Sequence, residues 1–345
     1  MRVGIIGCGK IAQIRHIPEY AENPNAELAA FFDLNSERAS EVARPFGGRV
    51  FDSWQDLVSS DVDAVSVCTA NVSHAEIAIG ALRAGKHVLL EKPMATTAEE
   101  CEAILAAERT SGKLLMIDLN QRFTSAHKLA RELLASGEIG ELITFRTMFG
   151  HGGPEIWSVD PGASTWFFDP KFTTLGAMGD LGVHKTDIIH FLTGQRIVEA
   201  TGKVATLEKR GPDGELIGVD DNAWAIYKLA GGQVGTMNAS WSHHGKEDNS
   251  TVLYGSKGII FIYCDPDNQV VVEKPGATAR KFQVEPIQTN DNQTKSGAID
   301  AFVEAVLTSG QSPISGEEAF ASMRAVFAAL ESSRIGAPVE IPENM

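Results

Sequence analysis

The stretch VGIIGCGKIA, residues 3–12, runs from an apolar segment into a glycine turn, and a second apolar run, LAAFF at 28–32, ends in Asp33. A strand, a glycine turn that opens a helix, and an acidic residue about twenty positions later form a dinucleotide-binding fingerprint. Gly7 permits the tight turn, Gly9 lets the backbone approach a pyrophosphate, and the small Ala12 allows the helix to pack on the strand. The pattern predicts a dinucleotide bound at the start of this helix.

Asp33 also predicts which dinucleotide binds. Its carboxylate would accept hydrogen bonds from the hydroxyls of the adenosine ribose and would repel a 2′-phosphate. Leu34, the next residue, offers no charge that could hold such a phosphate. We therefore expect NAD rather than NADP. The alternative is a glycine turn that binds nothing, and the strands on both sides, with the acid at the expected spacing, argue against it.

Length and composition limit the possible classes of protein. The 345 residues suggest about two domains, and 43% apolar residues suffice for a sizeable core. The net charge of −15 argues against nucleic acid or anionic membranes as partners, because both require a basic surface. Four cysteines without CxxC spacing favour free thiols in a reducing cytoplasm. We expect no signal peptide, because strand-like residues follow Met1 directly, and no membrane span, since no apolar run approaches ~18 residues.

The hydrophobic pattern divides the chain into two halves. Residues 1–120 alternate short apolar runs with amphipathic segments, which predicts a Rossmann-type α/β domain with a parallel sheet. Residues 121–345 carry hairpin turns and strands with one polar and one apolar face, which predicts an α+β domain with a mainly antiparallel sheet. Three helix starts are marked by polar residues, the last two as capping boxes: Ser36, Thr97 with Glu100, and Ser315 with Glu318.

Further candidate site residues follow the strand HVLL at 87–90, which runs directly into Glu91-Lys92-Pro93. Ligands of open parallel sheets bind beyond the carboxyl ends of the strands, so Lys92 is expected at the cofactor edge. His74 begins a helix at the same edge and could equally be a helix-start residue without a ligand. Besides Gly7, Gly9 and Asp33, the predicted cofactor contacts are Lys10, Ile11, Thr69, Asn71, His74, Glu91, Lys92 and Gln121.

Five blocks of sequence carry a resemblance to a known family: GCGKIA at 7–12, CTANVSHA at 68–75, AGKHVLLEKP at 84–93, NQRF at 120–123 and GDLGVHKTD at 179–187. In this order they resemble the Gfo/Idh/MocA family, the relatives of glucose-fructose oxidoreductase and inositol dehydrogenase. Two positions depart from the family pattern: Ala70, where proline is more common, and Leu175, in a loop usually richer in glycine. The resemblance implies a large open sheet in the second domain, whose outer face would join subunits into a homodimer or homotetramer.

Alcohol oxidation assigns roles to the candidate residues. Removing hydride from an alcohol carbon also requires a base for the hydroxyl proton and a cation or donor for the developing alkoxide. Asp180, His184 and Asp187 have i, i+4 and i+7 spacing, which places them on one face of a helix running to about residue 192. The resemblance implies that Lys92, Asp180 and His184 meet over the nicotinamide. His184 would be the general base or acid, Lys92 the cation on the reacting oxygen, and Asp180 their partner, with Asp187 behind them.

The Asp180 and His184 pair has two other interpretations. An Asp and a His at i, i+4 can form a surface pair, or the acid can stabilise a helix start. The pair could also bind zinc or iron with a third ligand, although the family chemistry needs no metal and we predict none. The candidates for that third ligand are His151, His243 and His244.

The leading hypothesis is an NAD-dependent dehydrogenase that acts on a hydroxyl of a small polyhydroxylated substrate: a sugar, a cyclitol or a sugar derivative. One alternative is a glycosidase that oxidises a sugar hydroxyl transiently and returns the hydride to bound NAD. The other is an NAD-sensing regulator without turnover, against which the presence of Lys92 with the Asp180 and His184 pair argues. Substrate contacts are predicted from Lys92, Arg122, Trp166, Asp180 and His184, with simple packing an equal alternative for Arg122 and Trp166.

Overall fold

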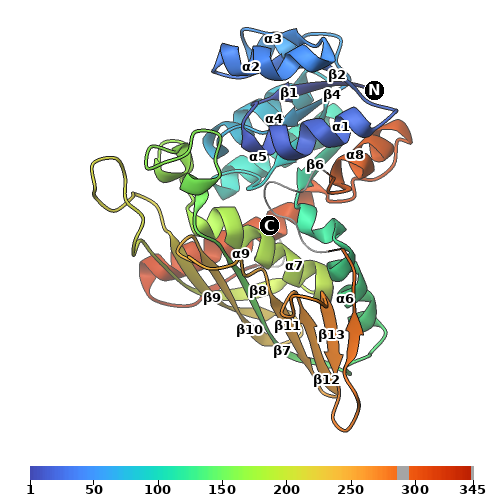
Figure 1. Cartoon of the computed structure of the whole chain (residues 1–345), viewed down its shortest axis with the longest axis vertical. Coiled ribbons are helices and arrows are strands. Elements are labelled where there is room, and N and C mark those ends of the chain that lie inside the picture. The colour runs from blue at the N-terminus through green and yellow to red at the C-terminus, as the bar shows by residue number, and fades with distance from the viewer. Residues whose placement is uncertain (286–294, 343–345) are drawn as a thin grey trace.

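The structure is a computed structural model that describes residues 1–285 and 295–342, and it contains two sheets of different type (Figure 1). The first sheet has six parallel strands in the order β3-β2-β1-β4-β5-β6, which confirms the Rossmann-type prediction. β4 and β6 are buried along their whole length because helices cover both faces of the sheet. The strands are β1 Arg2–Ile6, β2 Glu27–Phe32, β3 Arg49–Val50, β4 Ala64–Val67, β5 His87–Glu91 and β6 Leu115–Asp118.

The order of these strands determines where a ligand fits. β2 and β3 lie on one side of β1, whereas β4, β5 and β6 lie on the other. The connections therefore diverge between β1 and β4, and they leave a crevice at the carboxyl ends of these two strands. The helices between the strands are α1 Ile17–Glu22, α2 Ser36–Ala43, α3 Trp54–Val58, α4 His74–Arg83 and α5 Ala98–Ser111.

The second sheet has nine strands in the order β14-β13-β12-β11-β7-β10-β9-β8-β15. β7 and β10 pair in parallel, and the other neighbours pair antiparallel, which confirms the mainly antiparallel prediction. The strands are β7 Leu142–Gly150, β8 Ile197–Ala205, β9 Asn222–Leu229, β10 Val234–Ser240, β11 Thr251–Gly255, β12 Gly258–Ile262, β13 Val270–Glu273, β14 Arg280–Phe282 and β15 Val339–Glu340.

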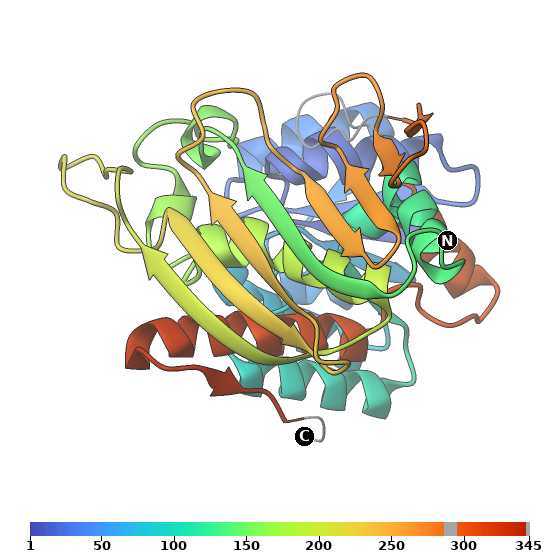
Figure 2. The same cartoon turned by 90° about the horizontal axis from the view of Figure 1, so that it is seen from below.

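The two faces of this sheet differ. Along β9, Ala225 and Tyr227 are buried whereas Trp224 and Ile226 are 42% and 50% exposed, the alternation expected of a strand with two environments. The buried face packs against helices, and the outer face lies in front of them in Figure 2. The helices of this half are α6 Ser125–Ala135, α7 Val183–Thr193, α8 Ala298–Leu307 and α9 Gly316–Ile335.

The chain returns to the first domain after the second sheet. α8 packs against α1, where the Glu19 carboxylate accepts from the backbone of Ser296 and Gly297, at 2.6 and 2.9 Å. Asn23 also donates to Asp300, at 2.7 Å. The Rossmann half therefore includes a segment far beyond residue 120, and the division at 120 remains a prediction for the point where the backbone first crosses.

Several local predictions can be compared with the helix ends. Thr97 and Glu100 form the expected capping box. Ser36 is not the cap of α2, because the side chain of Asn35 accepts from the backbone N–H of Arg38 instead. At α9, the Ser315 side chain caps the helix, but no reciprocal bond from the Glu318 carboxylate completes the box. Among the described residues, no helix combines the length and apolar character needed to cross a membrane.

Candidate active site

The glycine turn after β1 has the geometry that a dinucleotide requires. Gly7 has φ 91°, and a Cβ there would lie 2.6 Å from the carbonyl oxygen of Cys68, so only glycine fits. A Cβ at Gly9 would meet no heavy atom within 4 Å, which leaves open space in front of the turn. The helix that follows begins as a π-helical segment, Ala12–His16, before α1. The turn can therefore hold the pyrophosphate of NAD.

Asp33 lies at the end of β2 and is held against the glycine turn. Its carboxylate accepts from the backbone N–H groups of Cys8, at 2.7 Å, and Asn35, at 2.8 Å. Leu34 extends into solvent, but Arg38 on α2 lies 3.6 Å from the carboxylate and also contacts Asp160 at 2.8 Å. Sequence reasoning considered only the adjacent position and missed this cation one helical turn later. Because Arg38 offsets part of the charge of Asp33, we expect a less strict discrimination against a 2′-phosphate than Asp33 alone would give.

Lys92 and Asp180 meet although 88 positions separate them. Lys92, directly after β5, donates from Nζ to Oδ1 of Asp180 at 2.6 Å and to its backbone carbonyl at 3.1 Å. Trp241, just beyond β10, donates from Nε1 to Oδ2 of the same carboxylate at 3.0 Å. Lys92 and Asp180 both line the cavity in front of the glycine turn. Both domains thus contribute to one charged site at the predicted edge, and the role of Trp241 had no signal in the sequence.

His184 lies one helical turn beyond Asp180, on α7. It is buried, and its Nδ1 has no hydrogen-bond partner among the described residues. Burial lowers the pKa of His184 well below its usual value, and the charges of Lys92 and Arg15 lower it further. The imidazole is therefore neutral at pH 7 and can accept a proton. His184 is not among the residues that line the cavity.

Asp187 has other partners in the described part of the chain than Asp180 and His184, and its place behind them stays a prediction. Its carboxylate accepts from Nη2 and Nε of Arg122, at 2.6 and 2.7 Å, and from Ser322 at 3.1 Å. The turn that carries Asp180, Met178–Gly182, is π-helical, which changes the angular spacing relative to a regular α-helix. Arg122, a predicted substrate contact, is consequently engaged by Asp187 and does not line the cavity at the glycine turn.

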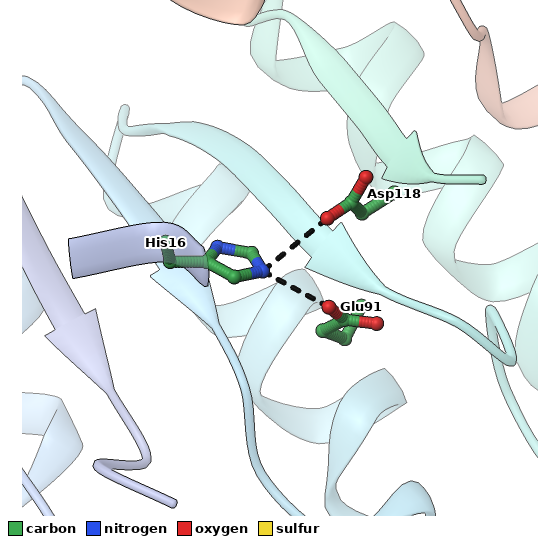
Figure 3. A group of neighbouring side chains, drawn as sticks. All are labelled: His16, Glu91 and Asp118. Carbon is green, nitrogen blue, oxygen red and sulfur yellow. Dashed lines mark hydrogen bonds and ion pairs between the residues drawn. The ribbon is translucent and has the colours of Figure 1, made fainter. Parts of the chain in front are cut away.

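His16, Glu91 and Asp118 form a buried charged cluster in the first domain (Figure 3). Nε2 of His16 lies 2.9 Å from Oε1 of Glu91 and 3.3 Å from Oδ2 of Asp118. Burial alone opposes a charge on His16, but the Cys68 sulfur and the two carboxylates raise its pKa well above the usual range. The pKa of Glu91 falls to about 2, because the contact and charge of His16 outweigh its burial. An imidazolium between two carboxylates accounts for this geometry.

The same three residues are the one group in 1–285 and 295–342 whose spacing could hold a metal ion. The alternative metal site considered from the sequence does not assemble there. His151 accepts from the backbone of Gly153, and His244 contacts Glu208, so neither joins Asp180 and His184. His243 is likewise absent from any such group in these ranges.

The other predicted cofactor residues fall into two sets. Lys10, Ile11, Thr69, Asn71 and Glu91 line the cavity. His74 and Gln121 are buried and do not line it. Both ring nitrogens of His74 contact backbone carbonyls, of Pro93 at 2.8 Å and of Thr69 at 3.0 Å, so His74 ties the turn after β4 to the turn after β5.

Aromatic residues from one loop of the second domain complete the cavity. Trp166, a predicted substrate contact, lines it together with Trp157 and Phe167. Trp166 stacks on Phe167 with ring centroids 3.9 Å apart. Nε1 of Trp157 is buried without a hydrogen-bond partner in the described part of the chain. Sequence reasoning missed Trp157, since an isolated tryptophan in a loop has no motif around it.

Comparisons with known proteins match both halves of the chain. Residues 1–119 match a family model described as an oxidoreductase family with an NAD-binding Rossmann fold, and residues 127–261 match the C-terminal domain model of the same family, GFO/IDH/MocA. The levoglucosan dehydrogenase of Pseudarthrobacter phenanthrenivorans is 31% identical over 313 residues, which cover 82% of this chain and 79% of that protein. This chain belongs to the Gfo/Idh/MocA family.

Other members of the Gfo/Idh/MocA family extend the comparison over the whole chain. The inositol 2-dehydrogenase of Rhizobium meliloti is 26% identical, with 96% of each chain covered. A structure of levoglucosan dehydrogenase in complex with NADH and levoglucosan has a TM-score of 0.87 and 25% identity, covering 99% of this chain and 100% of that one. The cofactor is NAD, as the glycine turn and Asp33 predicted, and the chain is an oxidoreductase of CH–OH groups.

Proposed function

We propose that this protein is an NAD-dependent dehydrogenase that oxidises one hydroxyl-bearing carbon of a sugar, a cyclitol or a sugar derivative. The observation that carries the proposal is the contact between Lys92 and Asp180 at the mouth of the glycine-turn cavity. It joins a cation from the first domain to an acid from the second, at the place where NAD fits. NAD, when bound, accepts the hydride.

The residues of the site divide the remaining work. The Lys92 ammonium donates to the reacting oxygen and stabilises the negative charge that develops there. The neutral imidazole of His184 takes the hydroxyl proton through Asp180 or a water, because His184 does not itself line the cavity. Asp180, held by Lys92 and Trp241, orients the ammonium and accepts from a neighbouring hydroxyl of the substrate.

Two features support a polyhydroxylated substrate. The relatives named above are dehydrogenases of levoglucosan and inositol. The cavity also combines charged groups with the ring faces of Trp157, Trp166 and Phe167, which suit the alternating polar and C–H surfaces of a sugar ring. Within residues 1–285 and 295–342 the indole N–H of Trp157 has no hydrogen-bond partner, so it is a suitable donor to a substrate hydroxyl.

A screen of sugars, inositols and sugar acids with NAD, followed by NADH absorbance, tests the proposed function. A dehydrogenase produces NADH in proportion to one free polyol. Release of free sugar from a glycoside without net NADH would indicate the glycosidase instead. NAD binding without turnover on any of these compounds would indicate a regulator.

The role of Asp33 at the ribose is tested by the Asp33→Ser variant. Removing the carboxylate takes away the repulsion of a 2′-phosphate and leaves Arg38, which still contacts Asp160, beside the ribose, so the ratio of kcat/KM for NAD over NADP should fall by about tenfold or more. Glu37→Ser, on α2 next to Arg38, is a matched control that also removes one carboxylate. We expect its ratio of kcat/KM for NAD over NADP to stay within about twofold of the parent. An unchanged ratio in Asp33→Ser would mean that Asp33 does not face the ribose.

We also infer a homo-oligomer joined through the outer face of the second sheet, on the resemblance and on three exposed side chains, Trp224, Ile226 and Val234. Sedimentation equilibrium tests this inference, and a monomer at micromolar concentration would contradict it.

We infer a cytoplasmic location, because the four free cysteines support a reducing compartment.

A further inference from the structure

A second cavity lies on the helical side of the second domain, with a volume of about 310 Å³. It shares no lining residue with the cavity at the glycine turn. Its walls come from α6, the end of α7 and the start of α9, and in Figure 1 α7 and α9 lie between the two sheets with α6 at their side. The volume is about ten times the ~30 Å³ that one water occupies in the liquid, which suffices for a small ligand. Six of its lining residues are Arg122, Arg131, His190, Phe191, Arg196 and Glu318.

Three guanidinium groups line this cavity from three separate segments. Arg131 on α6 lies with Cζ 4.6 Å from the ring centroid of Phe191, and Arg122 lies 5.7 Å from the same centroid. One ring therefore orients two cations toward a common space. Arg196 approaches from the segment between α7 and β8. Within the described ranges, neither Arg131 nor Arg196 has a carboxylate at ion-pair distance, whereas Arg122 contacts Asp187 and Glu318.

The charges of these guanidinium groups act on His190, which lies in the cavity wall. Burial, together with the charges of Arg196 and Arg122, lowers the pKa of His190 to about 3. Arg122 and Arg196 thus both act on His190, although 74 positions separate them in the sequence. With His190 neutral, three cations face two carboxylates, so the cavity is a positive region on a chain whose net charge is −15.

We propose that this cavity binds the phosphate group of a small molecule. A carboxylate is satisfied by a single bidentate guanidinium, whereas a phosphate dianion offers three oxygens that can accept from guanidiniums approaching from different directions. Arg131 and Arg196 are the principal ligands, because their N–H donors are not engaged by acids of the described chain. Arg122 contributes charge while it remains bound to Asp187.

The cavity is connected to the proposed active site by two elements. Arg122 follows β6 in the turn Asn120–Phe123, and it holds Asp187, which lies three residues beyond His184 on α7. A ligand that engages Arg122 therefore contacts the helix that carries His184. This connection makes the second cavity suited to an effector rather than to a second substrate.

Calorimetric titration of the full chain with inorganic phosphate tests the proposal without measuring turnover. Saturating NADH fills the glycine-turn site, and potassium chloride keeps the ionic strength constant, so neither the cofactor site nor general screening contributes. We expect one phosphate per chain, with Kd about millimolar or tighter. In the double variant Arg131→Gln/Arg196→Gln the affinity should fall at least about tenfold.

The matched control is Arg83→Gln/Lys257→Gln, which removes the same charge from two exposed positions on α4 and on the hairpin between β11 and β12. Its phosphate affinity should stay within about twofold of the parent. NADH should bind all three proteins equally, which shows that the variants fold. No phosphate binding by the parent, or equal weakening in both double variants, would overturn the proposal.

Discussion

His16 in the first domain and His184 in the second are both buried, with exposed fractions of 0% and 6%. Their pKa values nevertheless move in opposite directions. The pKa of His16 rises because Cys68 and the carboxylates of Asp118 and Glu91 outweigh burial. The pKa of His184 falls because burial is reinforced by the cations Lys92 and Arg15.

The difference shows that burial alone does not determine the charge of a histidine in this protein. Removal from water always favours the neutral form, by an amount that a close carboxylate can exceed and a close cation can only increase. The first domain thus holds a charged imidazole as part of a buried ion cluster. The second domain presents a neutral imidazole to the proposed reaction, and a neutral imidazole is the form that accepts a proton.

The largest expected effect is a loss of stability in mild acid. His127 and His190 have pKa values of about 3 and His151 of about 4, and the pKa of His184 is also well below its usual value, all chiefly through burial. In the unfolded chain each titrates near ~6.5, so below that pH the unfolded state binds protons that the folded state does not. The free energy of unfolding should fall by up to about 5 kcal/mol by pH 5.5.

The contribution of His16 to the free energy of unfolding changes with pH in the opposite direction. Its folded pKa is raised, so its contribution is fully present below ~6.5 and is lost as the pH rises through the folded value. Urea unfolding between pH 5 and 9 measures both contributions, that of the neutral buried histidines and that of His16. A stability that stays flat below pH 6.5 would contradict the assignment of neutral buried histidines.

The second prediction compares the two imidazoles directly. His16→Leu leaves Glu91 and Asp118 buried without their cation, and the free energy of unfolding should fall by about 3–5 kcal/mol. His184→Leu replaces a neutral side chain of similar volume, and the loss should stay below about 1.5 kcal/mol. Urea unfolding followed by both fluorescence and circular dichroism checks the difference. Equal losses would remove the distinction between the two sites.

The third prediction concerns turnover. His184→Ala should lower kcat by about 100-fold, the usual scale for the loss of a general base, with the affinity for NAD little changed. His127→Asn is a suitable control, because this histidine is also buried and neutral but lies on α6, where its Nδ1 contacts Thr124 and the carbonyl of Gln121. Steady-state kinetics with the substrate found in the screen measures both. A fully active His184→Ala would exclude His184 from the reaction.

The smallest expected effect comes from Lys185, which is fully buried beside His184 and donates to the carbonyl of Asn249 at 2.8 Å. Burial lowers the pKa of Lys185 to about 7, and its remaining charge contributes to the low pKa of His184. Lys185→Met removes that charge, so the acid limb of the kcat/KM profile should move to higher pH by less than about one unit. A shift to lower pH would show that Lys185 does not act on His184.

The parts of the fold and site that could be predicted depend on short stretches of chain. The glycine turn, Asp33 and Lys92 follow from strands that end at one edge of a parallel sheet, and the connections that arrange this edge are themselves local. The capping box at Thr97 and the alternation along β9 also involve residues a few positions apart.

Contacts between distant segments could not be predicted in this way. The sequence determined that a dinucleotide-binding sheet is followed by a mainly antiparallel one, because apolar periodicity and glycine placement act within a few residues. Only the tertiary structure decided that Arg122 binds Asp187, that Trp241 donates to Asp180, and that Glu91 and Asp118 both contact His16. Side chains interact with the groups that lie close to them in space. Packing brings together groups whose separation along the chain does not predict that they meet.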